Sequence, residues 1–211
     1  MNMNEDASSR GAAPDFDVAT DGWCRQAKRL PSPNCDARPQ AMAIDLLVIH
    51  NISLPPGQFG GPFIADLFGN CLDYAAHPYF DQLRSLRVSA HFLIRRDGAL
   101  LQFVSANERA WHAGASCFDG RHACNDFSIG VELEGSDYEA FTPLQYASLA
   151  ELTRALYKRY PLTDVAGHQH IAPARKTDPG PFFDWDQYRA LLAGPRNSTG
   201  SATSLRFPET E

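Results

Sequence analysis

The sequence predicts an α/β fold of the α+β type, in which helices pack on a mixed central β-sheet. Three stretches carry this prediction. Residues 46–50 form an apolar run typical of a strand buried on both faces. Residues 127–133 alternate between apolar and small or polar side chains, with the two-residue period of a strand. Residues 142–160 carry leucines at near-helical spacing, which indicates a long helix.

Shorter elements complete the expected sheet. The dipeptide Asp97-Gly98 lies between residues 91–94 and 100–104, and Asp-Gly between two apolar segments favours a β-hairpin. Residues 165–167 predict another short strand. After a loop rich in glycine and proline, residues 63–68 can begin a helix.

Both of the larger helices have recognisable start signals. Thr142 can cap the helix that follows it, Pro143 suits the first turn, and Gln145 stands at the capping-box position. Pro161 ends this helix, because proline cannot continue it. A last amphipathic helix is expected to begin near Asp184. Strands and helices therefore intermix along the chain, as a mixed sheet with packed helices requires.

The composition restricts the possible functions. The formal net charge is −6 and the pI is about 5.6, whereas a nucleic-acid-binding protein normally carries a basic patch. No apolar run is long enough to cross a membrane. The acidic N-terminal residues lack the apolar centre of a secretory signal peptide. The five cysteines form no Cys-x-x-Cys pair, which fits free thiols in a reducing compartment. We therefore expect a cytoplasmic protein that binds neither nucleic acid nor membranes.

The chain has the length of one domain of ordinary size. We expect this domain over residues 19–193, with enough apolar residues for a core. Residues 1–18 and 194–211 consist mainly of small, polar or charged residues. Both segments are expected to be disordered tails.

The side chains that most clearly indicate chemistry lie in residues 167–180. This segment holds two histidines, two cations and a carboxylate, and its prolines exclude a regular helix or a central strand. His50, at the end of an apolar strand, could join Asp178 and one histidine of this loop. Two imidazole nitrogens and one carboxylate oxygen suit zinc and leave a fourth position for water. From the residues alone, His168 and His170 fit this role equally well.

A second feature is a pair of acids on one strand. Glu132 and Glu134 fall on the same face, which also carries Ser128 and Gly130 instead of apolar bulk. Such a face leaves room for a site, and a strand face exposed to solvent would show the same pattern. The residues alone leave both interpretations open.

Seven segments together carry a family resemblance. They are RLPSPN at 29–34, VIHNISLPPG at 48–57, AHPYF at 76–80, LRVSAH at 86–91, WHAG at 111–114, CNDFSIG at 124–130 and RKTDPG at 175–180. From about residue 22 to residue 192 the chain resembles the cytoplasmic N-acetylmuramyl-L-alanine amidases of the AmpD type. These enzymes cleave 1,6-anhydro-muropeptides during bacterial cell-wall recycling.

The resemblance implies a mixed sheet with flanking helices and a single zinc site in a surface cleft. It implies His50, His168 and Asp178 as the ligands of one zinc ion, which selects His168 over His170. It further implies Glu132 as the catalytic acid-base residue and Lys176 as a second catalytic residue beside the metal.

The resemblance also implies a substrate and the residues that bind it. The partner would be an anhydro-muropeptide, the enzyme would act as a monomer, and the reaction would limit the inducer of β-lactamase expression. The implied substrate-binding residues are Asn51, Tyr79, Arg87, Trp111 and Arg175. The remaining histidines, His77, His91, His112 and His122, are not assigned to the metal.

The alternative function is a recognition module that binds muropeptides without cleaving them. Relatives of that kind lose a metal ligand or the catalytic acid. This chain keeps all three ligands together with Glu132 and Lys176, so hydrolysis is the favoured interpretation.

Overall fold

The computed structural model describes residues 15–194 and 204–209, and its centre is a six-stranded mixed sheet. All neighbouring strands are parallel except the β4–β5 hairpin, which confirms the predicted mixed sheet. Across the sheet the order is β1 (Lys28–Arg29), β5 (Leu100–Gln102), β4 (Phe92–Ile94), β9 (Ser128–Glu134), β3 (Leu46–Ile52) and β10 (Asp164–Gly167).

The other elements are short strands and helices around this sheet. The strand pairs are β2 (Cys35–Asp36) with β6 (Arg109–Ala110), and β7 (Cys117–Phe118) with β8 (Arg121–His122). The α-helices are α1 (Phe63–Phe68), α2 (Pro143–Arg159), α3 (His168–Ile171) and α4 (Trp185–Ala193), and 3-10 turns span η1 (Pro78–Leu83) and η2 (Cys124–Asp126). Within the described ranges, none of these helices has the length and apolar character needed to cross a membrane.

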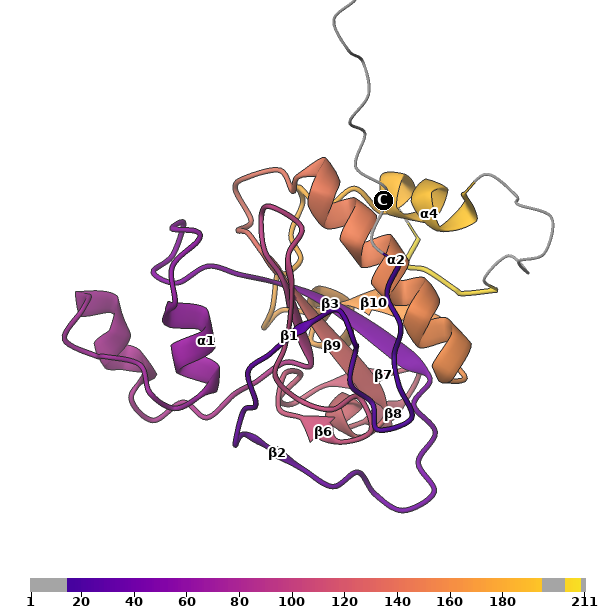
Figure 1. Ribbon diagram of the computed structural model, residues 1–211, viewed down its shortest axis with the longest axis horizontal. Helices are drawn as coiled ribbons and strands as arrows, with labels where there is room; N and C mark the ends of the chain where they lie inside the picture. The colour runs from indigo at the N-terminus through magenta and orange to yellow at the C-terminus, as the bar shows by residue number, and fades with distance from the viewer. Residues whose placement is uncertain (1–14, 195–203, 210–211) are drawn as a thin grey trace, which may run out of the picture.

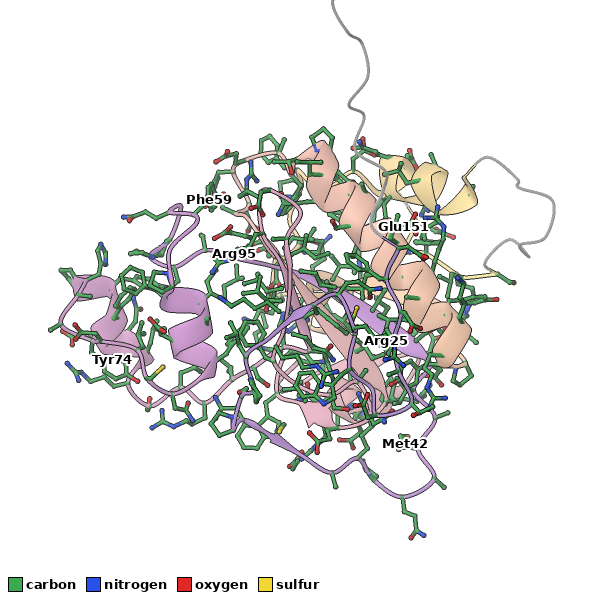
Figure 2. All side chains as sticks on the ribbon, viewed as in Figure 1. Arg25, Met42, Phe59, Tyr74, Arg95 and Glu151 are labelled. Carbon is green, nitrogen blue, oxygen red and sulfur yellow. The ribbon has the colours of Figure 1, made fainter. Side chains whose placement is uncertain are left out.

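Helices α2 and α4 lie side by side over one face of the sheet (Figure 1). The main core forms there, because Leu47 and Ile49 of β3 pack with leucines of α2 such as Leu152 and with Tyr188 of α4. Side chains fill the layer between sheet and helices (Figure 2). Each fully buried leucine or isoleucine contributes about 1.5–3 kcal/mol through removal of apolar surface from water. The packed core between the sheet and helices α2 and α4 holds the sheet rigid, so residues on the opposite face of the sheet have fixed positions.

The opposite face of the sheet carries α1 and long loops (Figure 1). Alternate residues of β3 point to this side, so Leu46, Val48 and His50 share it. Helix α1 packs against Leu93 and Leu101 in a second apolar cluster. The end of β3 that carries His50 therefore lies on this face between two apolar clusters, one that contains Leu46 and Val48 and the other that contains Leu93 and Leu101.

The predicted capping box of α2 is confirmed. The backbone N–H of Gln145 donates to Thr142 Oγ1 over 3.1 Å, and the N–H of Thr142 donates to Gln145 Oε1 over 3.0 Å. Asp184 caps α4 by accepting a hydrogen bond from the N–H of Gln187. One leucine of the predicted stripe, Leu144, is 58% exposed, because the first buried residue of α2 is Gln145.

The predicted tails, 1–18 and 194–211, lie mostly outside the described residues. Their described ends are structured, contrary to the expectation. Phe16 and Val18 belong to the main core, and Leu205 packs against it. Arg206 forms a parallel bridge with Asp164 of β10. The structured chain thus extends beyond 19–193 at both ends, because a few apolar side chains in otherwise polar segments reach the core.

Candidate active site

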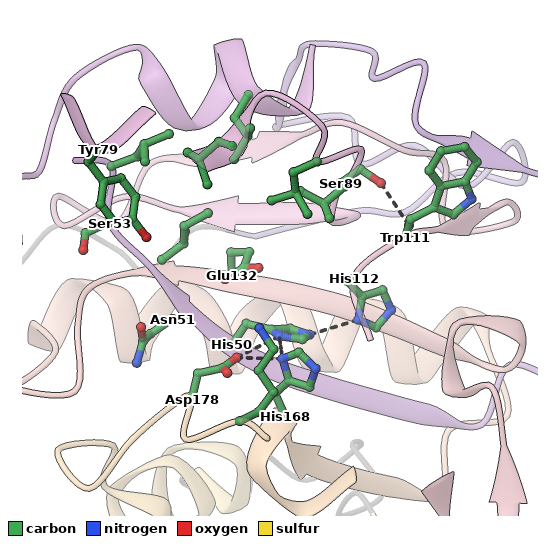
Figure 3. A pocket seen from close by; sticks show the side chains of 17 residues that line it. His50, Asn51, Ser53, Tyr79, Ser89, Trp111, His112, Glu132, His168 and Asp178 are labelled. Atoms are coloured by element: carbon green, nitrogen blue, oxygen red, sulfur yellow. Dashed lines mark hydrogen bonds and ion pairs between the residues drawn. The ribbon is translucent and has the colours of Figure 1, made fainter. Parts of the chain in front are cut away.

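Strand register brings the chemically suggestive residues to one edge of the sheet. His50 on β3 lies opposite Glu132 on β9 in a parallel pair. Gly167 of β10 lies opposite Ile49, so His168 follows at the level of His50. Parallel strands end at the same edge of a sheet, which is where such sheets usually place their sites. Figure 3 shows His50, Glu132 and His168 around one cavity, with Asp178 reaching it from a loop.

Three ligand-type atoms converge at this edge. His50 Nδ1, His168 Nδ1 and Asp178 Oδ2 lie 3.0 Å from one another in all three pairs. Both imidazoles are buried, with 1% and 3% of the residue exposed. These three residues form a cluster able to hold a metal ion. The structure therefore brings together the three predicted ligands.

His170 lies elsewhere. Its Nδ1 accepts a hydrogen bond of 2.8 Å from the N–H of Gly167, and its ring lies against Trp185. The short helix α3 starts at His168, so the two histidines point in different directions. This geometry separates two residues that composition alone could not distinguish.

The electrostatics suit a cation at the three atoms. Burial lowers the pKa of His50 to about 4, so its imidazole is neutral at neutral pH and can offer a lone pair. Burial raises the pKa of Asp178, but the two imidazoles that face it lower this pKa by more, so the group is a carboxylate. Two neutral imidazoles and a carboxylate are the donor set of many zinc centres. The residues present thus fit a zinc ion.

Glu132 differs from the ligands in having an unpartnered oxygen. The residue is 8% exposed, and its Oε2 is buried without a hydrogen-bond partner. Burial and then the charge of Asp178 raise the pKa of Glu132 well above its usual value, against the opposing charge of Lys176. A buried acid with a raised pKa beside a metal-ligand cluster is a candidate for proton transfer. Lys176 lines the same cavity.

The cavity has a polar floor and an apolar wall. Its volume is about 290 Å³, and the metal-ligand cluster lies at its base. The apolar side chains that line it are Ile52, Leu54, Leu67, Leu83, Leu86 and Val88. The cavity therefore offers apolar contact on one side and ionisable groups on the other.

The five predicted substrate-binding residues divide into two groups. Asn51, Tyr79 and Trp111 line the cavity. Arg87 lies between two lining residues, and its guanidinium donates to the carbonyl of Leu86. Arg175 donates to the carbonyl oxygens of Ala113 and Ala115, outside the cavity lining. Neither arginine is among the residues that line the cavity.

Sequence reasoning left His112 and the apolar wall without a role. His112 lines the cavity, and its Nδ1 lies 2.9 Å from His50 Nε2. The two histidines are 62 positions apart, so no local pattern connects them. The only available signal was that residues 111–114 form one of the segments with family resemblance. In the sequence, the apolar residues of the cavity wall look like ordinary hydrophobic core residues.

Comparisons with known proteins agree with this geometry. The family model for N-acetylmuramoyl-L-alanine amidase matches residues 40–181. The 1,6-anhydro-N-acetylmuramyl-L-alanine amidase AmpD of Citrobacter freundii is 57% identical over 174 residues, which are 82% of this chain and 93% of the relative. A crystal structure of a selenomethionine derivative of AmpD superposes with a TM-score of 0.79 at 56% identity, covering 81% of this chain and 97% of the other.

A more distant solved structure contains a ligand. It is the Escherichia coli amidase AmiD in complex with anhydro-N-acetylmuramic acid-L-Ala-D-γ-Glu-L-Lys, with a TM-score of 0.53 at 28% identity, covering 84% of this chain and 65% of that one. The fold and the metal-ligand cluster define a metal-dependent amidase. The chain belongs to the N-acetylmuramoyl-L-alanine amidase family and, within it, to the AmpD type.

Proposed function

We propose that the protein hydrolyses the amide bond between 1,6-anhydro-N-acetylmuramic acid and L-alanine in muropeptides, with one zinc ion as cofactor. The observation that carries the proposal is the convergence of His50, His168 and Asp178 beside the unpartnered carboxylate oxygen of Glu132. A metal site together with one acid and one cation matches metal-assisted amide hydrolysis. Membership of the amidase family supports the same reaction.

His50, His168 and Asp178 would hold the zinc ion. Bound there, zinc supplies Lewis acidity that lowers the pKa of a water molecule and polarises the scissile carbonyl. Burial lowers the pKa of His50 and so keeps its imidazole neutral, and both imidazoles point their Nδ1 atoms toward Asp178. The ligand that remains to complete the site is water or substrate.

Glu132 would accept the proton of the attacking water and deliver it to the leaving amine of L-alanine. The raised pKa of Glu132 suits this exchange, because a group that both takes and returns a proton works best with a pKa close to the operating pH. Glu132 lines the cavity, and its Oε2 has no competing hydrogen bond.

Lys176 would stabilise the negative charge that develops on the carbonyl oxygen during attack. An ammonium group in the cavity is available for this because it lies on the same loop as Asp178 and lines the same space. Charge stabilisation of this kind is often the largest single contribution to catalysis.

The lining of the cavity fits a muropeptide. Tyr79 and Trp111 present flat faces for sugar or peptide, and Asn51 offers an amide that is held by Asp137. Arg87 and Arg175, each next in sequence to a residue that lines the cavity, would bind carboxylates of the stem peptide, for which guanidinium is the best-suited cation. The AmiD structure with an anhydro-muramyl peptide supports this class of ligand.

The proposal also includes the setting in which the protein acts. The five cysteines are free, which supports a reducing compartment such as the cytoplasm. The metal ligands, Glu132 and Lys176 come from one chain, which supports action as a monomer. Light scattering coupled to gel filtration would measure the oligomeric state.

The test is hydrolysis of anhydro-muramyl tripeptide by the purified protein, with and without a chelator, followed by addition of zinc. We expect release of free tripeptide that stops on chelation and returns with zinc. Tight binding of the muropeptide without cleavage, by protein that carries zinc, would contradict the proposal and favour a recognition module.

A further inference from the structure

The outer nitrogens of both metal-ligating histidines are bound by two consecutive residues. His50 Nε2 lies 2.9 Å from Nδ1 of His112, and His168 Nε2 lies 3.1 Å from the carbonyl oxygen of Ala113. His112 is buried, and Figure 3 shows its contact with His50 on the side away from Asp178. One dipeptide therefore contacts both imidazoles that face the metal position.

The hydrogen-bond directions around His112 follow from the far end of the network. The hydroxyl of Ser128 donates to the carbonyl oxygen of Cys124 over 2.6 Å, because a carbonyl can only accept. Ser128 Oγ is then free only to accept, so His112 Nε2–H donates to it over 3.2 Å. His112 Nδ1 carries the lone pair and accepts from His50 Nε2–H.

This chain of donors fixes the tautomer of His50. With its proton on Nε2, the neutral imidazole keeps a lone pair on Nδ1, the atom that faces Asp178 and His168. At His168 the carbonyl of Ala113 has the same effect, since Nε2–H must donate to it. Both ligand nitrogens are thereby prepared as lone-pair donors toward one point.

The dipeptide is itself held in place. Asn125 Oδ1 accepts hydrogen bonds from the backbone N–H groups of both His112 and Ala113, over 3.1 and 2.8 Å. Arg38 in turn donates to the carbonyl oxygens of Asn125 and Ser128. Hydrogen bonds therefore connect Arg38 to His112 through Asn125 and Ser128.

The strand beneath His112 leaves space for its ring. A Cβ on Gly130 would lie 2.5 Å from His112 Cγ, which is too close for any side chain at that position. Glycine in the middle of a central strand weakens it, so its use here has a packing reason. The reason is the imidazole that lies against β9.

We propose that His112, supported by Ser128 and Asn125, is a positioning residue that fixes the tautomer and direction of His50 and so sets the affinity of the metal site. The inference rests on the proposed function in one respect, namely that the site binds zinc. His112 acts through His50 and is not itself a ligand. Groups that hold the second nitrogen of a ligating histidine typically change metal affinity about 10- to 100-fold when removed.

The experiment compares two substitutions by their zinc dissociation constants, measured by competition with a chromogenic chelator on metal-free protein. His112→Phe keeps an aromatic ring at the position and removes the acceptor. His112→Asn leaves space but keeps an acceptor, because Oδ1 of asparagine stands at the same number of bonds from the backbone as Nδ1 of histidine. We expect His112→Phe to weaken zinc binding about 10- to 100-fold and His112→Asn to retain most of the affinity.

A role in packing alone predicts the opposite order, since phenylalanine fills the space that asparagine leaves empty. Equal affinity for wild type and His112→Phe, or tighter binding by His112→Phe than by His112→Asn, would overturn the inference. Wild-type protein that binds no zinc would overturn the proposed function as well, so the two failures are distinguishable.

Two further variants guard the test against misfolding. Ser128→Ala removes the acceptor that orients His112, and we expect it to weaken zinc binding by a smaller factor than His112→Phe. Unchanged zinc affinity would contradict the role of the Ser128–His112–His50 hydrogen bonds. Tyr188→Phe alters another fully buried ring, whose hydroxyl bonds to Thr153 in the core between the sheet and α2, and is expected to leave zinc affinity unchanged. Circular dichroism of the metal-free proteins verifies that each is folded.

Discussion

Glu132 and Glu134 lie two residues apart on the same face of β9, yet their surroundings are opposite. Glu134 is 1% exposed and fully partnered: Arg95 binds its Oε1 over 2.6 Å, and the N–H groups of Gly60 and Arg96 donate to it. Glu132 is also buried, with 8% of the residue exposed, but its Oε2 has no partner. Figure 2 shows Arg95 near the loop that carries Phe59, on the side of the molecule away from Met42.

The difference between the two acids comes from residues far away in sequence. The β4–β5 hairpin delivers Arg95 to Glu134, whereas the loop after α3 brings Asp178, another negative charge, toward Glu132. Removal of one partner from a buried ion pair leaves an uncompensated charge and destabilises the fold, while a buried carboxylate without a partner can exchange a proton. Identical side chains on one strand face thus become a structural and a candidate catalytic residue.

The largest expected effect is on activity at the unpartnered acid. Glu132→Gln removes the proton acceptor while keeping the shape of the side chain, and we expect the turnover number to fall about 10²- to 10⁴-fold. Zinc affinity should stay close to that of wild type, because Glu132 is not a ligand. Steady-state hydrolysis and chelator competition measure the two quantities. Full turnover by zinc-loaded Glu132→Gln would remove Glu132 from the mechanism.

The next effect concerns the cation of the same cavity. Lys176→Met keeps the length of the side chain and removes the charge that would stabilise the developing oxyanion. We expect a loss of about 10²- to 10³-fold in turnover, with little change in stability because Lys176 is exposed. An unchanged rate would show that the oxyanion is stabilised by other groups.

At the partnered acid, the expected effect is on stability. Glu134→Gln leaves the Arg95 guanidinium, whose side chain is 15% exposed, without its counter-charge, and we expect a loss of about 3 kcal/mol in the free energy of unfolding. Urea denaturation measures it. Glu139→Gln breaks the exposed pair with Arg96 and is the matched control, with an expected loss below about 1 kcal/mol. Equal losses in the two variants would contradict the expectation that the buried Glu134–Arg95 pair matters more for stability than the exposed Glu139–Arg96 pair.

The smallest effect is a dependence of stability on pH in the metal-free protein. The pKa of Glu132 is higher in the folded than in the unfolded chain, so the folded state binds more protons above about pH 4.5, the ordinary value. Wild type should therefore lose stability relative to Glu132→Gln as the pH rises from there, by up to about 1.4 kcal/mol per pH unit. Groups that do not interact with Glu132 titrate alike in both proteins and cancel in this difference. A difference that does not change with pH would refute the raised pKa.

Local sequence signals predicted the elements that depend on neighbouring residues. The capping box at Thr142, the hairpin dipeptide Asp97-Gly98 and the alternation that became β9 each act within a few positions, and all three were confirmed. The family resemblance selected the three candidate metal ligands, whose ligand-type atoms register and loop geometry then bring within 3.0 Å of one another.

Features that depend on distant partners escaped prediction. The two-residue strands β2 and β6 exist only because they pair with each other across more than seventy positions. His112 has no neighbour in sequence that reveals its contact with His50. The split between Glu132 and Glu134 likewise depends on Arg95 and Asp178, which no period or spacing along β9 can indicate.

The bridge between Arg206 and Asp164 affects whether the edge of the sheet can pair with another copy of the chain. Strand β10 is the last of the six-stranded sheet, and an uncovered last strand invites pairing with another chain. The backbone of Arg206 takes up the hydrogen bonds of Thr163 and Val165, while its guanidinium binds Asp164 and Asp119. The chain thereby pairs with part of its own sheet edge, along β10, which ends at Gly167, and those two backbone groups are no longer available to pair with another chain.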